Sequence, residues 1–308
     1  MKSRNIFRVL LVFVALLVAV ALCVVFLHQR TTISHQGRSL AFWLASLGNA
    51  EVGDGLLMTD AQSWLDTKYP GKRVAFIDMG PEAGPILLHE LRVKDRLWDR
   101  FMAKHAGLFA RLGVTNTPAS VRGKRAALAL AMSGEVVKQY LPELQLAFSD
   151  PATRNRAAWG MLAVGDVAVP WLSASLDSQT NAAVVEACCW ILSQRGEFAS
   201  NSIPHVLPHL NHPSGMTRSI VAWSVGRMTT DSDILVPALL PLLKDSNRYA
   251  RNGAAGSLAR LGPRAASAIP EFLEAIESAE PDEQRYRIEE LRKISSEAAS
   301  QVKAKSIP

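Results

Sequence analysis

The sequence predicts an all-α protein, an α-solenoid of stacked helix pairs preceded by one N-terminal transmembrane helix. Three observations support this fold. A block of about 31 to 33 residues recurs along the chain, which indicates stacked supersecondary units that bury their apolar faces against one another. Apolar residues follow helical spacing in each block, whereas no segment alternates with a period of two for long. Glycine and proline recur at fixed places in the block.

Three landmarks set the register of the block. Each copy has a pair of small residues in its first helix: Ala126-Ala127, Ala157-Ala158, Cys188-Cys189, Val221-Ala222 and Ala254-Ala255. A glycine closes that helix in four copies (Gly134, Gly165, Gly196, Gly262), and Thr229 stands in the other. A proline then opens the second helix: Pro142, Pro170, Pro204, Pro237, Pro270. Glycine is favoured where a helix ends at positive φ, and proline is tolerated in a first turn.

The clearest copy runs from Arg154 through Gly165 and Pro170 to Leu176. Its pattern resembles the HEAT-like repeat of the phycobilin-lyase type. Arg154, Arg218 and Arg251 fill the arginine position of that repeat, Arg122 is one residue off, and Val185 departs from it. Together with a lead-in at 37–44 and a degenerate copy at 73–92, the chain is similar over residues 37–277 to membrane-anchored bacterial HEAT-repeat proteins, a family without assigned activity. The resemblance implies a fold and says little about function.

The N-terminus has a different composition. Lys2, Arg4 and Arg8 precede an uncharged apolar run at 9–27, whose length of about 19 residues suffices to span a bilayer as a helix. The basic flank predicts a cytoplasmic N-terminus in the inner membrane and an extracytoplasmic, periplasmic C-terminal domain. The alternatives are a cleaved signal peptide and lipidation at Cys23. Against the second, Leu22 occupies the position that needs a small residue.

The remaining segments follow in order. Residues 1–8 form the basic cytoplasmic end and 9–27 the signal anchor. Residues 28–66 are linker and lead-in, with short helices expected at 39–47 and 61–66. The solenoid covers 67–278, comprising the degenerate repeat 73–92, a helical insertion at 95–117 and regular repeats at 118–278. Residues 279–308 form a charged capping helix or tail, which a solenoid needs on its exposed end.

Motifs for chemistry are missing from the sequence. It contains no nucleophile elbow, Walker-type loop, dinucleotide fingerprint or zincin motif, which favours a protein that is not an enzyme and has no cofactor or small-molecule substrate. Cys188 and Cys189 stand in the small-residue column, so they are expected to be core residues. His205, His209 and His212 have a spacing able to hold zinc, but Pro208 disturbs the helix between them. No catalytic or metal site is therefore predicted.

The net charge of +6 and pI near 9.4 raise the possibility of a polyanion partner. Residues 68–125 hold twelve Lys and Arg against five Asp and Glu. Binding of nucleic acid or another polyanion there is the alternative function, although export across a membrane separates the chain from nucleic acid. Anionic lipid headgroups could also contact this segment. The repeat arginines are expected to pair with acids such as Asp150 and Asp245. A bilin-lyase-like or other enzymatic activity is the third possibility.

Trp159, Trp190 and Trp223 occupy the same position in three consecutive repeats, between Leu128 and Gly256. On a helical wheel Trp159 lies opposite the core stripe, so the three rings are expected to form an exposed ridge that binds a protein partner. The alternative is that neighbouring first helices pack on each other through these rings. The predicted function is a membrane-anchored scaffold for protein–protein interaction, with an unknown protein partner and the membrane contacted through residues 9–27.

Overall fold

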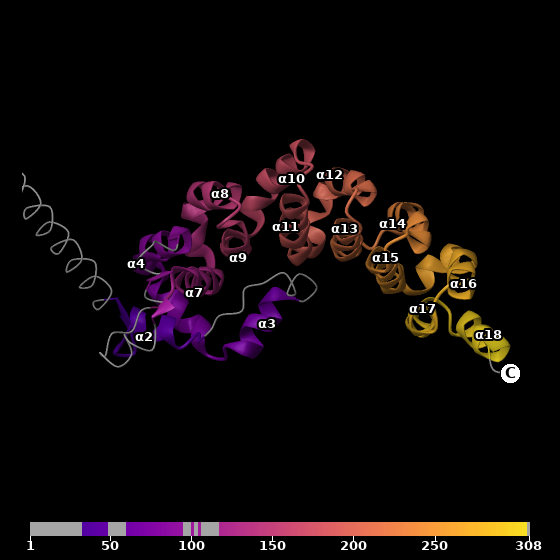
Figure 1. The fold of residues 1–308 in the computed structure, drawn as a ribbon, viewed down its shortest axis with the longest axis horizontal. Coiled ribbons are helices and arrows are strands. Elements are labelled where there is room, and N and C mark those ends of the chain that lie inside the picture. The colour runs from indigo at the N-terminus through magenta and orange to yellow at the C-terminus, as the bar shows by residue number, and fades with distance from the viewer. Residues whose placement is uncertain (1–32, 49–59, 95–99, 102–103, 106–116, 307–308) are drawn as a thin grey trace, which may run out of the picture. The chain divides into compact units, whose positions relative to one another are not determined.

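A computed structural model of the protein describes residues 33–48, 60–94, 100–101, 104–105 and 117–306. These residues are almost entirely helical (Figure 1), as predicted. The chain divides into two compact units, residues 1–51 with 65–137 and residues 52–64 with 138–308. The transmembrane helix predicted at 9–27 and most of the insertion predicted at 95–117 lie outside the described residues.

The first unit holds a short hairpin and several helices. Strands β1 (Ser34–His35) and β2 (Arg38–Ser39) pair antiparallel, a small sheet that the sequence did not predict. The lead-in helix α2 (Leu40–Ala45) is capped by Ser39, whose hydroxyl accepts from the backbone N–H of Phe42. Helices α4 (Lys72–Arg92) and α7 (Ala119–Met132) pack along each other.

Helix α4 corrects one expectation about the first unit. A degenerate copy of the helix pair was expected at 73–92, but Lys72–Arg92 is one continuous helix with Pro81 and Pro85 inside it. Gly80 does not end a helix here. A Cβ there would lie 2.8 Å from Val136 and 3.2 Å from the Ser133 side chain, so glycine allows close packing instead of a chain reversal.

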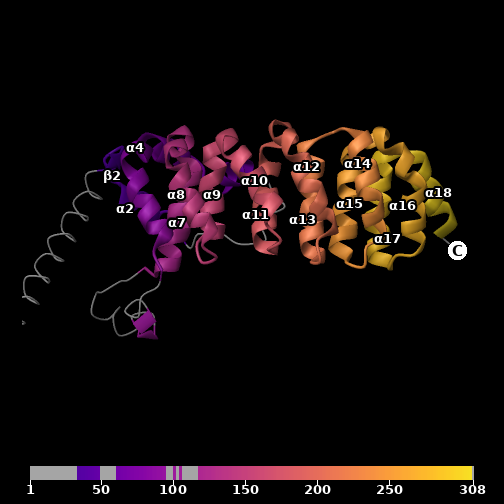
Figure 2. The same cartoon turned by 90° about the horizontal axis from the view of Figure 1, so that it is seen from above.

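The second unit is a stack of helix pairs. Its first helices are neighbours in one row, called here the first-helix row: α9 (Arg154–Val164), α11 (Ala182–Gln194), α13 (Gly215–Met228), α15 (Arg248–Arg260) and α17 (Pro281–Ile294). The second helices form the other row: α8 (Leu141–Ser149), α10 (Val169–Ser178), α12 (Ile203–Val206), α14 (Ser232–Leu239) and α16 (Ile269–Glu277). Figure 1 shows the two rows on opposite sides of this unit, and Figure 2 shows the helices side by side from above.

The turn residues act as predicted. Gly134, Gly165, Gly196 and Gly262 have φ of +68°, +72°, +57° and +59°, values that other residues rarely adopt. Thr229, in the copy without glycine, is extended instead with φ of −148°. Proline lies in the first turn of α8, α10, α12 and α16, whereas Pro237 lies inside α14.

All five small-residue pairs are buried, none of their members being more than 3% exposed. Small side chains at this position let adjacent helices approach closely, so the column sets the spacing of the stack. The segment 279–308, expected to be a charged capping helix or tail, contains two helices. It forms α17 and α18 (Ser296–Ser306), separated by Ser295, whose φ of −149° and ψ of 112° are extended.

Candidate functional site

The tryptophan column lies along the first-helix row, and two of its rings are not exposed. Trp159 on α9 is 3% exposed and Trp190 on α11 is 2% exposed, so the expected exposed ridge is wrong for both. Their ring centroids are 5.3 Å apart at an interplanar angle of 58°. The helical wheel considered each helix alone, whereas the next helix in the row covers each ring. Only Trp223 on α13 is half-buried.

Trp223 packs on two glycines of the next first helix. A Cβ at Gly256 would lie 2.6 Å from the ring of Trp223, and a Cβ at Gly253 would lie 3.2 Å from it. Gly256 occupies the tryptophan register in α15, so the absence of a side chain at that place makes room for the preceding ring. The packing alternative for the column is thus what the structure shows.

A segment from earlier in the chain contacts this column. Helix α3 (Ala61–Lys68) contributes its first turn to the second unit, because the division between the units falls between Trp64 and Leu65. The Trp64 ring lies 5.4 Å from that of Trp159, centroid to centroid. The backbone N–H of Ala61 donates to Oε1 of Gln194 at 2.8 Å.

Polar groups flank the column at one position per repeat. Gln194, Arg227 and Arg260 each follow the column position by one helical turn. Arg260 Nε donates to the carbonyl of Gly226 at 3.1 Å, and Arg227 Nε lies 3.5 Å from that of Ser193. Burial and the nearby Arg260 lower the pKa of Arg227, and the carboxylate of Asp60 opposes this shift. Asp60 therefore lies within electrostatic range of Arg227, at the start of α3.

One polar atom of the column lacks a partner. The indole Nε1 of Trp190 is buried and has no hydrogen-bond acceptor among the residues that the structure describes. A buried N–H without an acceptor destabilises the state that contains it. The column therefore contains one buried N–H that makes no hydrogen bond among the described residues.

At the beginning of α9, α13 and α15, the repeat arginines bind the chain that leads into each helix. Arg154 donates to the carbonyls of Phe148 and Ser149, and Arg218 to those of His212 and Pro213. Arg218 also forms a two-point ion pair with Asp245, at 2.6 and 2.7 Å, which confirms that predicted pairing. Arg251 and Glu283 form the same kind of ion pair one repeat later, at 2.6 and 2.7 Å. These arginines join adjacent repeats, so their hydrogen-bonding groups are occupied within the fold.

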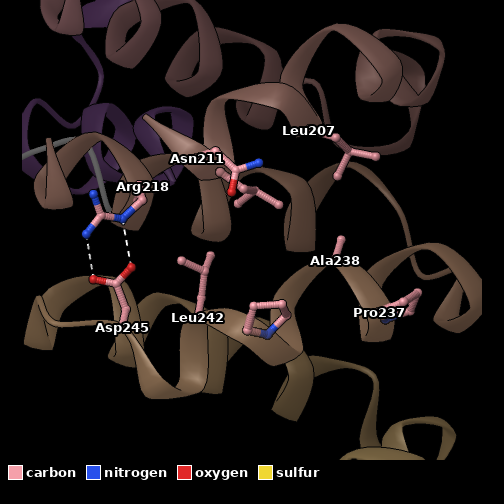
Figure 3. A pocket seen from close by; sticks show the side chains of 9 residues that line it. Leu207, Asn211, Arg218, Pro237, Ala238, Leu242 and Asp245 are labelled. Atoms are coloured by element: carbon pink, nitrogen blue, oxygen red, sulfur yellow. Dashed lines mark hydrogen bonds and ion pairs between the residues drawn. The ribbon is translucent and has the colours of Figure 1, made fainter. Parts of the chain in front are cut away.

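A groove of about 520 Å³ opens beside the Arg218–Asp245 pair (Figure 3). Leucine, proline and alanine side chains make up most of its wall, joined by Asn211. Figure 3 shows the ion pair at one end of this wall. Arg218 and Asp245 are the charged residues of this lining, and most of the other residues are apolar, so the groove favours apolar contact.

Both cysteines of the small-residue column are buried, as predicted. Burial raises the pKa of the Cys188 thiol to about 12, and burial next to Cys188 raises that of Cys189 well above its usual value. Neutral, inaccessible thiols are poor nucleophiles and poor metal ligands.

The three histidines bind separate groups of the preceding repeat. His205 Nδ1 lies 2.7 Å from a carboxylate oxygen of Asp177, His209 Nε2 lies 3.2 Å from the carbonyl oxygen of Leu176, and His212 Nε2 lies 2.9 Å from that of Thr180. Asp177 is an orienting carboxylate that sequence reasoning missed, because it comes from another repeat. In the described part of the chain, no three ligand side chains gather where they could hold a metal ion.

The described cations of the basic segment 68–125 include several with intramolecular partners. Arg122 pairs with Glu90 at 3.0 Å, Arg125 donates to the carbonyl of Gly48 at 2.8 Å, and Lys72 donates to that of Ser46 at 2.5 Å. These contacts reduce the charge available to a polyanion. Burial lowers the pKa of Lys72.

By length and composition, one described helical stretch could cross a membrane, Arg154–Ser178. It comprises α9, the turn at Gly165–Ala168 and α10, and half of it is buried in the stack. It is therefore accounted for as one helix pair of the solenoid.

The repeat register, the left-handed glycine turns and the paired rows agree with a comparison against protein families, in which residues 203–292 match the family of HEAT repeats. Residues 203–292 therefore resemble HEAT repeats. Among curated proteins, none matches the sequence significantly. The matched region, residues 203–292, runs from the start of α12 into α17 and includes Trp223 and the Arg218–Asp245 pair.

Two solved structures are similar to this chain. One is the CpcE–CpcF complex of phycocyanin lyase from Nostoc sp., at 21% identity, covering 85% of this chain and 96% of that one, with a TM-score of 0.40. The other is human deoxyhypusine hydroxylase in complex with glycerol, at 17% identity, 88% and 96% coverage and a TM-score of 0.34.

These neighbours correct the expectation that the protein is not an enzyme. Both are named as enzymes, so an enzymatic activity of this chain is not excluded. At these identities the likeness assigns neither activity to this chain.

Proposed function

We propose that this protein is a membrane-anchored interaction scaffold whose HEAT-repeat solenoid binds a protein partner along the first-helix row. The observation that carries this proposal is the contact of the first turn of α3 with the row, where the Trp64 ring contacts that of Trp159 and Ala61 donates to Gln194. The row thus holds a helical turn from outside the stack through a side-chain amide and an aromatic ring, and aromatic rings are enriched at protein interfaces.

Charge and exposure also support this location. Arg260 is exposed beside the column, and Trp223 is half-buried, so the row continues past the part that α3 contacts. The described cations of residues 68–125 with intramolecular partners give the polyanion alternative less support.

Site-specific photo-crosslinking in cells tests the proposal. A photoreactive residue replaces Arg260 in the first-helix row, and the matched control replaces Glu277, an exposed residue of α16 in the other row. We expect a protein adduct from position 260 and none from position 277. Adducts from position 277 alone, or from neither position, would contradict the proposal.

Membrane anchoring is the second part of the proposal and has its own test. The apolar run at 9–27 behind three basic residues supports an uncleaved anchor with its N-terminus inside. We expect external protease to digest the C-terminal domain in spheroplasts but not in intact cells. A mature N-terminus near residue 30, or protection of the domain in spheroplasts, would contradict this topology.

A further inference from the structure

The contact between α3 and the first-helix row has a defined direction. Trp64 lies on α9, Ala61 donates to Gln194 of α11, and Asp60 is within electrostatic range of Arg227 on α13. Trp64 and Ala61 thus contact two successive repeats, and the charge of Asp60 acts on the third. The turn runs opposite to the order of the repeats, from α13 towards α9. Direction and spacing of this kind define a binding register, because each repeat supplies one group to one position of the bound helix.

The chemistry of the bound turn is also defined. Asp60 caps α3 by accepting from the backbone N–H of Ser63 at 3.0 Å, and its carboxylate lies within electrostatic range of Arg227. Four residues later Trp64 supplies an aromatic ring. The row therefore recognises a helix that begins with an acidic residue, presents a free N–H in its first turn, and carries an aromatic residue one turn later.

The polar positions of the row continue past the α3 turn, because the exposed Arg260 follows Arg227 in the next repeat. The contact is made by a single helical turn, because the chain from Leu65 onward belongs to the other unit. A single turn is easily opened, since a short helix owes its stability to its contacts. A longer helix could contact more of the row.

We infer that the first-helix row is a docking site for a helix of a partner protein, one with Asp or Glu at its first position and an aromatic residue at its fifth, and that the first turn of α3 is the resident ligand that this helix displaces. The inference rests on the proposed function and specifies its partner. Competition between α3 and the partner keeps the column covered until the partner is present.

A peptide-binding measurement tests the inference with the full chain in detergent. The probe is a fluorescent peptide of residues 57–69, which contains Asp60, Ala61 and Trp64. The variant Trp64→Ala removes the resident ring but leaves the row unchanged. We expect this variant to bind the peptide at least about ten-fold more tightly than the wild type, because the wild-type site is competitively occupied.

Two controls establish the recognition. The Trp64→Ala chain should not bind a peptide in which the same tryptophan is alanine. Replacing Arg227 by Gln in that chain should weaken the binding of the wild-type peptide. It should have little effect on the binding of an Asp60→Asn peptide, since that peptide already lacks the negative charge. Equal loss for both peptides would overturn the assigned register.

A second variant covers the case in which Trp64→Ala does not fold. Ala61→Pro removes the N–H that donates to Gln194 at a helix position where proline is tolerated, so it weakens the resident turn without changing the row. Absence of peptide binding up to about 1 mM in a folded variant, or equal binding by variant and wild type, would overturn the inference. Peptide binding without a crosslinked adduct from position 260 would contradict the proposed function but not this binding site. An adduct from position 260 without peptide binding would contradict this inference alone.

Discussion

Trp223 and Gly256 are complementary across two repeats: the indole of α13 fills the space that a side chain on α15 would need. The contact links the last ring of the column to the next helix of the stack. It explains why the tryptophan register ends in glycine, and it makes one position of the repeat dependent on its neighbour.

Gly256→Ala is expected to destabilise the protein by about 1–3 kcal/mol, because the new Cβ would clash with the indole ring. The same substitution should cost less in a Trp223→Ala background, where the space is free. Urea unfolding of the two single variants and the double variant measures this coupling. Strictly additive effects would show that the ring moves aside without cost.

Truncating the buried rings should be costly. Trp190→Ala and Trp159→Ala are each expected to destabilise the fold by about 3–5 kcal/mol, since each removes a large side chain from a packed site. Replacing Leu146, which is 64% exposed, by Ala is the matched control and should change stability little. Thermal midpoints compare the three variants. Small changes in stability at both tryptophans would instead support the exposed ridge that the sequence predicts.

The stability of the C-terminal repeats should fall in acid. The hydrogen bond from Arg251 lowers the pKa of Glu283, while burial opposes the shift. Because the pKa is lower in the folded state, the contribution of this carboxylate is fully present above its unfolded pKa and is lost as pH falls through its folded pKa.

We therefore expect Glu283→Gln to be less stable than the wild type by about 2 kcal/mol at pH 7, and the difference to shrink between pH 5 and pH 3. Urea unfolding of the wild type and the variant at pH 7, pH 5 and pH 3 measures this difference in stability. Glu289→Gln is the control, because the Glu289 side chain is 57% exposed and pairs with Arg292 at the surface. A difference that does not change with pH would contradict the ion-pair account.

The thiols of Cys188 and Cys189 should not react in the folded protein. With the pKa of Cys188 near 12 and that of Cys189 also raised, both remain protonated at pH 8 and out of reach of a maleimide. In a Cys23→Ser background we expect no labelling in buffer and labelling of both in urea. Glu277→Cys adds an exposed thiol as a positive control. Rapid labelling of the native protein would contradict the burial.

Sequence alone determined the features that depend on neighbouring residues. Gly165 and Gly196 end their helices at positive φ and Pro142 opens α8, because these requirements belong to the local backbone. The buried small-residue pairs also followed from periodicity, since a repeated spacing marks the face that each unit turns to its neighbours.

Tertiary structure decided what depends on distant segments. Gly80 could end a helix or allow close packing, and the side chains of Ser133 and Val136 settle it as packing. Trp159 lies opposite the small pair of its own helix, yet Trp190 and Trp64 cover its ring. No local sequence pattern predicts such contacts, because the groups that bury a side chain come from elements far apart in sequence. Side-chain periodicity therefore specified the repeat, and only the packed stack specified which of its faces remains accessible.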